Sequence, residues 1–378
     1  MQQLLRDQLE ARKIIEALRL GIVPQKYVEE FTFGRAKEIE QIKSWLRNEN
    51  ESSLVLVGEY GVGKTHLLEY LYSSLLKNNW AVSIVELDPN ELPFHKPKRV
   101  YEAIINSFRF GTKNGTFRDF LKEIAESNNC HELESHQYLG VIIRELKEGV
   151  ESEYSFEWIE GKQVVGNPPM FDYSTSANIY CNILSGIGWA SKSILGLNGF
   201  VILFDEAETV DSFWYSSYQN DKGWNFLKGM LLMASNKTEL MEENITPFFI
   251  SPYSGKIYLG EKTGLQYGGH FPYLRYLWRA PTNIKLIFAF APSYNILEKE
   301  PLNTLRKIEL KNLGEKYLDE ISKSVIRFYE YAYNLKVEQK NILKKVPKDK
   351  TRMFIKGLIE ALDLIRFYPN EKLENLLK

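Results

Sequence analysis

The sequence predicts an α/β protein of three layers, in which helices cover both faces of a parallel β-sheet, followed by a small all-α domain. Two observations support this fold class. Four short runs are apolar at nearly every position, as strands buried on both faces are, and segments of helical length separate them. The runs are Leu54–Val57, Val82–Leu87, Phe200–Phe204 and Ile284–Phe290.

Helical periodicity predicts the elements around these strands. Before the first strand, Leu4–Leu20 and about Ala36–Leu46 carry apolar residues at helical spacing, and Gly21 and Pro24 end the first of these helices. The remaining helices are expected between the strands and after the last one, at about Lys64–Lys77, Val100–Phe108, Ala177–Leu195, Tyr317–Leu335 and Phe354–Phe367.

These elements divide the chain into three ranges. Residues 1–50 hold the N-terminal helices, residues 51–311 the α/β core, and residues 312–378 the small helical domain, which we call the lid. Two stretches interrupt the core. Residues 111–174 are expected to form a largely helical insertion, and residues 246–269, rich in Gly, Tyr and Ser, a long loop or hairpin.

Composition is typical of a globular protein and indicates no partner. The 48 basic residues nearly balance the 49 acidic ones, so global charge neither favours nor excludes nucleic acid. The two cysteines, Cys130 and Cys181, lie far apart, which argues against a disulfide framework and predicts a cytoplasmic protein. No apolar run approaches the roughly 20 residues that a bilayer span needs, so no membrane is expected.

A phosphate-binding loop is the strongest motif. Residues 58–65 match the P-loop pattern G-x-x-x-x-G-K-[ST], directly after the first strand and before a helix. Glycines let backbone N–H groups point at a phosphate, Lys64 adds a charge for the β- and γ-phosphates, and the Thr65 hydroxyl can ligate magnesium. Chance produces the bare pattern at a rate on the order of 1% in such a chain, so we expect ATP and Mg²⁺ to bind. The expected nucleotide-binding set is Gly58, Glu59, Tyr60, Gly61, Val62, Gly63, Lys64, Thr65 and His66.

An apolar strand that ends in two carboxylates predicts the hydrolytic acids. Asp205 and Glu206 directly follow Phe200–Phe204. Ligands bind beyond the carboxyl ends of parallel strands, where Asp205 would hold the magnesium through water and Glu206 would deprotonate the attacking water. The alternative is an ordinary strand that leaves the core through a charged turn. Because one base suffices, we expect Glu208 to face solvent or a partner.

Beyond these motifs, the sequence resembles the AAA+ ATPases of the origin-recognition initiator clade, and among them the ATP-binding proteins of BREX phage-defence systems, the BrxC and BrxD type. The resemblance covers most of the chain and is weakest at residues 111–174 and 246–269. It rests on Leu18–Pro24, Phe31–Arg35, the P-loop from Gly58, Leu87–Pro89, Lys96–Tyr101 and Gly199–Glu208.

This resemblance implies roles for residues outside the two motifs. The Gly34-Arg35 turn would lie against the adenine. Arg306, before the last short strand, occupies the place of an arginine finger aimed at a neighbouring subunit's γ-phosphate. Arg352 occupies the place of sensor 2, an arginine that reaches from the lid to the nucleotide. For each arginine the alternative is a solvated helix or strand end.

The polar residue that AAA+ proteins carry after the fourth core strand, called sensor 1, is ambiguous in this sequence. The strand Ile284–Phe290 is followed by Ala-Pro-Ser-Tyr-Asn. Either Ser293 or Asn295 could serve, so hydrolysis is less firmly indicated than binding.

The leading functional hypothesis is an ATPase, converting ATP and water to ADP and phosphate, that acts as a nucleotide-driven switch or motor. It would form a homo-oligomer or a hetero-oligomer with other defence proteins, for example a helicase. One alternative is an initiator-like protein in which ATP gates DNA binding, although the residues after Asn312 hardly suffice for a lid plus a winged helix. Another is a signalling or scaffold NTPase with little turnover, against which the intact acid pair argues.

DNA is a further candidate partner because two stretches, residues 95–99 and 340–352, are locally basic. Charge runs of this kind are more often merely solvated. The sequence contains no identifiable docking motif for a protein partner.

Overall fold

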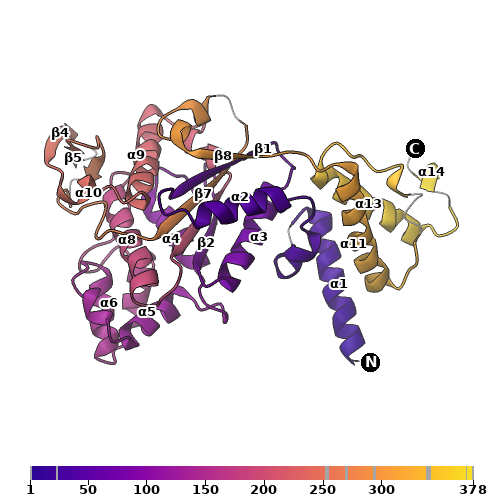
Figure 1. Cartoon of the computed structure of the whole chain (residues 1–378), viewed down its shortest axis with the longest axis horizontal. Helices are drawn as coiled ribbons and strands as arrows, with labels where there is room; N and C mark the ends of the chain where they lie inside the picture. Colours follow the sequence, from indigo (N-terminus) through magenta and orange to yellow (C-terminus); the bar gives the residue numbers. More distant parts are fainter. Residues whose placement is uncertain are drawn as a thin grey trace. The chain divides into compact units, whose positions relative to one another are not determined.

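The computed structural model describes residues 2–22, 24–251, 255–268, 271–292, 295–337, 342–371 and 373–376 (Figure 1). The chain forms two compact units. Unit 1 consists of Met1–Ser44, Val57–Ser73 and Ile308–Lys378, and unit 2 of Trp45–Leu56 and Ser74–Lys307. Each unit is therefore assembled from segments that lie far apart in the sequence.

A five-stranded sheet has the strand order β2-β3-β7-β1-β8. The pairs β2–β3 and β3–β7 are parallel. All four apolar runs of the sequence form strands of this sheet, and β8 is the short last strand, so the predicted α/β fold with a parallel sheet is confirmed. The strands are β1 (Ser53–Gly58), β2 (Ala81–Glu86), β3 (Phe200–Asp205), β7 (Ile284–Phe290) and β8 (Arg306–Leu310).

The central strands of unit 2 are buried along their whole length. Every residue of β3 and of β7 is buried. The rings of Phe204 and Phe288 stack across these two strands, with their centroids 4.9 Å apart. Three helices pack against β2, β3 or β7: α4 (Pro97–Ser107), α8 (Ala177–Ser193) and α9 (Ser217–Ala234).

Two further regions belong to unit 2. The first lies in the expected helical insertion, where Arg118 joins two helices by pairing with Glu153 and Glu160. The second is a separate antiparallel sheet of order β4-β5-β6. Their elements are α5 (Phe117–Glu126), η2 (Cys130–Glu132), α6 (Leu139–Lys147), α7 (Glu153–Ile159), α10 (Glu239–Glu242), β4 (Ile245–Ser251), β5 (Gly255–Gly260) and β6 (Gln266–Gly268).

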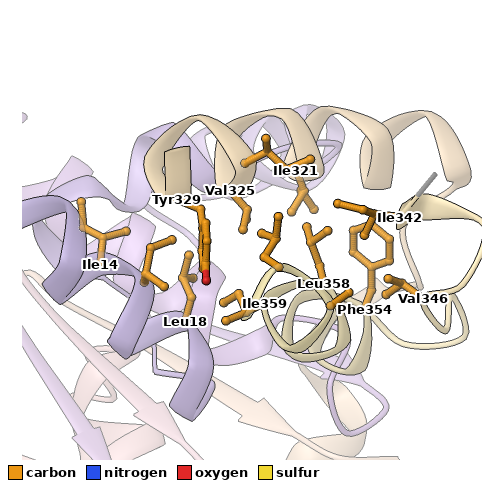
Figure 2. Packing of buried hydrophobic residues seen from close by; sticks show 14 of the residues in the cluster. Ile14, Leu18, Ile321, Val325, Tyr329, Ile342, Val346, Phe354, Leu358 and Ile359 are labelled. Atoms are coloured by element: carbon orange, nitrogen blue, oxygen red, sulfur yellow. The ribbon is translucent and has the colours of Figure 1, made fainter. Parts of the chain in front are cut away.

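Unit 1 combines helices from both ends of the chain. Its N-terminal helix α1 packs against α11 and α13 of the C-terminal segment, and Figure 2 shows their side chains in one hydrophobic core. Arg19 of α1 pairs with Asp363 of α13 at 2.8 Å. The elements are α1 (Gln2–Leu20), η1 (Gln25–Phe31), α2 (Ala36–Leu46), α3 (Lys64–Lys77), α11 (Glu315–Tyr333), α13 (Thr351–Phe367) and α14 (Leu373–Leu376), with α2 and α3 extending into unit 2.

The division of the sequence into three ranges stays a prediction. The structure adds that α1 packs against the lid helices α11 and α13. Within the described residues, no helix combines the length and apolar character that crossing a bilayer requires. Both cysteines are buried and carry free thiols.

Candidate nucleotide-binding site

The P-loop connects β1 to α3 through backbone conformations that favour glycine. Gly61 has φ +85° and Gly63 has φ +101°, in the region that side chains with a Cβ rarely adopt. The α-helix begins at Lys64, the last but one residue of the motif. The loop therefore ends at a helix N-terminus, where free N–H groups and the helix dipole favour an anion.

The charge of this loop comes from a largely buried lysine. Lys64 is 6% exposed, and its Nζ donates a hydrogen bond to the Gly58 carbonyl at 2.8 Å. Thr65 follows in the first turn of α3 and is exposed. A fixed ammonium and an adjacent hydroxyl match the needs of a phosphate and of a hard cation, respectively.

Arg35 supports the loop from the N-terminal segment. It is buried, and its Nη2 donates to the Val62 carbonyl at 2.6 Å while Nη1 pairs with Glu38 at 3.1 Å. The preceding Gly34 has φ +68°, and a Cβ there would stand 2.7 Å from a ring carbon of Tyr317. The resemblance to AAA+ proteins implies an adenine-side turn here. It did not predict that Arg35 supports the backbone of the P-loop.

His66 links the first turn of α3 to the same N-terminal segment. Its Nε2 lies 2.8 Å from the Thr32 hydroxyl, which donates its own hydrogen to the Val28 carbonyl. The histidine must therefore carry a hydrogen on Nε2 and donate it to the Thr32 hydroxyl. Burial, helped by the charge of Arg35, lowers the pKa of His66 to about 4, so the ring stays uncharged at neutral pH.

Arg352 brings the lid helix α13 to the P-loop. Its backbone N–H donates to the Gly61 carbonyl at 3.2 Å. Its Nη1 donates to the Tyr60 hydroxyl at 2.6 Å, and the guanidinium lies 5.3 Å from the centroid of that ring. Unit 1 thus brings together three predicted parts: the P-loop, the Gly34-Arg35 turn and Arg352.

The predicted acids lie in unit 2 at the end of β3. Asp205 is the last residue of the strand and is buried, and its Oδ1 accepts a hydrogen bond from the Glu206 backbone at 3.0 Å. Glu206 has φ +52°, an uncommon conformation for a residue other than glycine, asparagine or aspartate. Such residues concentrate at functional sites, where surrounding structure maintains them.

Glu208 differs from its expected role. It does not simply face solvent or a partner, because its Oε2 accepts a hydrogen bond from the Ala291 backbone at 3.0 Å. It thereby ties η3 (Ala207–Asp211) to the chain just after β7. Sequence spacing alone could not reveal this contact between residues 83 positions apart.

The remaining predicted residues are placed only in part. Ser293 lies outside the described residues. Asn295 is exposed, has φ +65° and precedes η4 (Ile296–Glu298), which is followed by η5 (Leu302–Thr304). Arg306 begins the edge strand β8 and pairs with Glu51 at 3.5 Å. Both partners are more than one-third exposed, so solvent screens this pair.

One family model matches part of the sequence. Residues 7–129 match the family described as "BREX system ATP-binding protein BrxC/D", which confirms the resemblance over the segment that contains the P-loop and the Gly34-Arg35 turn. No curated protein matches the sequence. Among solved structures, AMPPCP-bound DnaA from Aquifex aeolicus aligns with a TM-score of 0.39 and 13% identity, over 93% of this chain and 68% of that one.

Proposed function

We propose that this chain, whose residues 7–129 match the BREX ATP-binding family, binds ATP with magnesium and hydrolyses it. The observation that carries the proposal is the P-loop of unit 1. Two loop glycines have positive φ, a largely buried ammonium lies within the loop, and a helix begins directly after it. These are the features that a bound triphosphate requires.

The residues present also fit a magnesium ion by their chemistry. Magnesium prefers oxygen ligands and is commonly held by one or two protein groups plus phosphates and water. The Thr65 hydroxyl and the Asp205 carboxylate are such groups. The ion would neutralise charge on the phosphates.

Each remaining residue has a proposed part in the reaction. Lys64 binds the β- and γ-phosphates, and Glu206 orients the attacking water and takes its proton. Arg352 contacts the nucleotide from the lid, and Asn295 or Ser293 is the polar residue after β7. The Gly34-Arg35 turn lies against the adenine.

At the level of the assembly, we propose a nucleotide-driven switch or motor in a multi-protein phage-defence complex of the BREX kind, acting in the cytoplasm. The family description supports membership of that system. Arg306, half-exposed on an edge strand, supports a contact with a neighbouring subunit, either a second copy or another defence protein such as a helicase.

Binding of DNA is a weaker proposal, because one lysine of the basic stretches is buried and another is paired with a carboxylate. Lys98 is buried, and Lys348 pairs with Glu315 at 3.0 Å. ATP turnover measured with and without duplex DNA decides between a DNA-stimulated enzyme and one that responds only to protein partners.

The reaction itself is tested with Glu206→Gln. The amide is nearly isosteric but cannot accept the proton of the attacking water, so phosphate release should stop while ATP and magnesium still bind. An unchanged rate would place the base elsewhere, and loss of binding would make the residue structural. Glu208→Gln, two residues on, shows whether loss of any nearby carboxylate has the same effect.

A further inference from the structure

Arg352 occupies a position that is electrostatically unfavourable for a cation. It lies in the first turn of α13, where the helix dipole places partial positive charge. Two neighbours from other parts of unit 1 compensate: Tyr60 of the P-loop and Gly21 at the end of α1. The side chain thus lies against groups from two other segments of the chain.

Tyr60 contacts the guanidinium in two ways. Its hydroxyl accepts a hydrogen bond from Nη1 at 2.6 Å, and its ring centroid lies 5.3 Å from the guanidinium carbon. The P-loop pattern permits any residue at this position, and the tyrosine is 59% exposed. The loop itself does not need a large aromatic side chain there, so the contacts with Arg352 are what this residue adds.

Gly21 contributes by leaving space. It has φ +76°, and a Cβ built on it would stand 2.8 Å from Arg352 Nε and 3.1 Å from Nη2. Gly21 ends α1 through hydrogen bonds from its own N–H to Leu18 and from Ile22 to Ala17. The partial negative charge at this helix end favours a nearby cation.

We propose that Tyr60 and Gly21 are positioning residues for Arg352, so that the placement of the lid arginine depends on both the P-loop and the N-terminal helix. The inference rests on the proposed function, because Arg352 contacts a nucleotide only if the P-loop binds one. Neither residue touches reacting atoms; both act through the arginine. Since α1 shares a hydrophobic core with α13 (Figure 2), a shift of α1 also alters the surroundings of Arg352.

A double-mutant cycle tests the part played by Tyr60. Dissociation constants for ATP and ADP are measured by calorimetry for Tyr60→Ala, Arg352→Ala and the double variant. Each single change should lower the preference for ATP over ADP by about three- to tenfold, the range expected for the loss of one typical hydrogen bond. The double variant should match Arg352→Ala alone, because residues that act through one another are not additive. Tyr60→Phe, which keeps the ring, should fall between wild type and Tyr60→Ala.

The matched control is Tyr331→Ala, which removes an exposed tyrosine of α11 in the same unit and should leave the preference unchanged. If the effects of Tyr60→Ala and Arg352→Ala multiply in the double variant, Tyr60 does not act through the arginine and the proposal is overturned.

A second pair of variants tests Gly21. Asparagine tolerates positive φ better than most residues, so Gly21→Asn mainly introduces the close approach to Arg352 and to Lys356, whose Cε would stand 3.0 Å from the added Cβ. It should lower the preference for ATP as Tyr60→Ala does. Gly111 has a similar φ of +65° with no neighbouring atom within 4 Å, so Gly111→Asn should change nothing. Equal effects of the two asparagines would refute the role of Gly21.

Failure of the inference is distinguishable from failure of the proposed function. ATP binding that is absent, or that survives Lys64→Ala unchanged, would refute nucleotide binding by the P-loop. Binding that depends on Lys64 but shows independent effects of Tyr60 and Arg352 would refute the positioning role alone.

Discussion

The P-loop of unit 1 and the acid pair of unit 2 are built in different ways. The loop is held by residues from remote segments: the Arg35 side chain donates to the Val62 carbonyl, and Arg352 donates its side chain to the Tyr60 hydroxyl and its backbone N–H to the Gly61 carbonyl. The acids follow one fully buried strand, and Asp205 directly accepts the backbone N–H of Glu206. The shape of the loop therefore depends on packing within unit 1, whereas the position of the acids depends on where β3 ends.

The largest expected effect concerns Arg306. Replacing it tests whether one chain is sufficient for turnover or needs a neighbouring subunit. If this arginine completes a neighbour's site, turnover per subunit should rise with protein concentration, and Arg306→Ala should remove that rise. Arginine fingers in other enzymes contribute about 10³–10⁵ in rate, so even a much smaller effect is measurable by phosphate release. Lys311→Ala, which removes a more exposed cation just after β8, is the control.

A mixing experiment sharpens this prediction. An excess of Glu206→Gln subunits supplies intact fingers, and Arg306→Ala subunits supply intact bases, so the mixture should regain activity that neither variant has alone. Turnover independent of concentration, together with no rescue, would assign Arg306 to the charged flank of an edge strand.

The next effect in size tests whether the P-loop depends on the core of unit 1. Leu358 is fully buried in the core shown in Figure 2. Leu358→Ala should lower the free energy of unfolding by about 2–5 kcal/mol and weaken ATP binding as unit 1 loosens. Denaturant unfolding measures the first quantity and calorimetry the second. Met353→Ala on the same helix, where the side chain is exposed, should lower stability far less.

A smaller effect is expected when Arg35 is replaced. This change tests how much the hydrogen bond to the loop backbone contributes to ATP binding. Arg35→Ala removes the hydrogen bond to Val62 and leaves Glu38 without its partner. A hydrogen bond to a charged group contributes about 1.5–3 kcal/mol, so ATP affinity should fall about tenfold or more. Arg327→Ala, which breaks an exposed pair with Glu30, should leave the affinity unchanged. Equal affinities of the two variants would remove Arg35 from the site.

Sequence reasoning was most accurate where structure is local. It predicted the helix at Lys64–Lys77 with the same bounds as α3 and placed Asp205 at the end of a buried strand. Both depend on residues close together in the chain, through apolar runs and the spacing of glycines. The family match over residues 7–129 covers this helix but not Asp205.

Contacts between distant residues were not predictable from one sequence. Tyr60 and Arg352 are 292 positions apart, and no periodicity or spacing links them. The contact of Glu208 with Ala291 likewise depends on how η3 lies beside β7. The packing of α1 on the lid helices could not be predicted either, because an amphipathic pattern shows that a helix has an apolar face but not what covers it.

A shared response to acid compares the two units. Burial lowers the pKa of His66 in unit 1 and of His136 in unit 2, each to about 4 from 6.5. The folded protein therefore binds fewer protons than the unfolded chain between these values, and stability should fall as the pH drops from about 6.5 to 4. Across this window, the free energy of unfolding should depend less steeply on pH in His66→Gln than in the wild type. In the control His131→Gln, which changes an exposed residue, the dependence should stay as in the wild type.

The central claim is that the P-loop of unit 1 binds the phosphates of ATP through Lys64. Calorimetry of ATP binding in the presence of magnesium tests it most directly, comparing wild type, Lys64→Ala and the exposed-lysine control Lys37→Ala. The account predicts that wild type and Lys37→Ala bind alike, while Lys64→Ala loses most or all of its affinity because the only cation in the loop is gone. Near-wild-type affinity of Lys64→Ala would contradict the account.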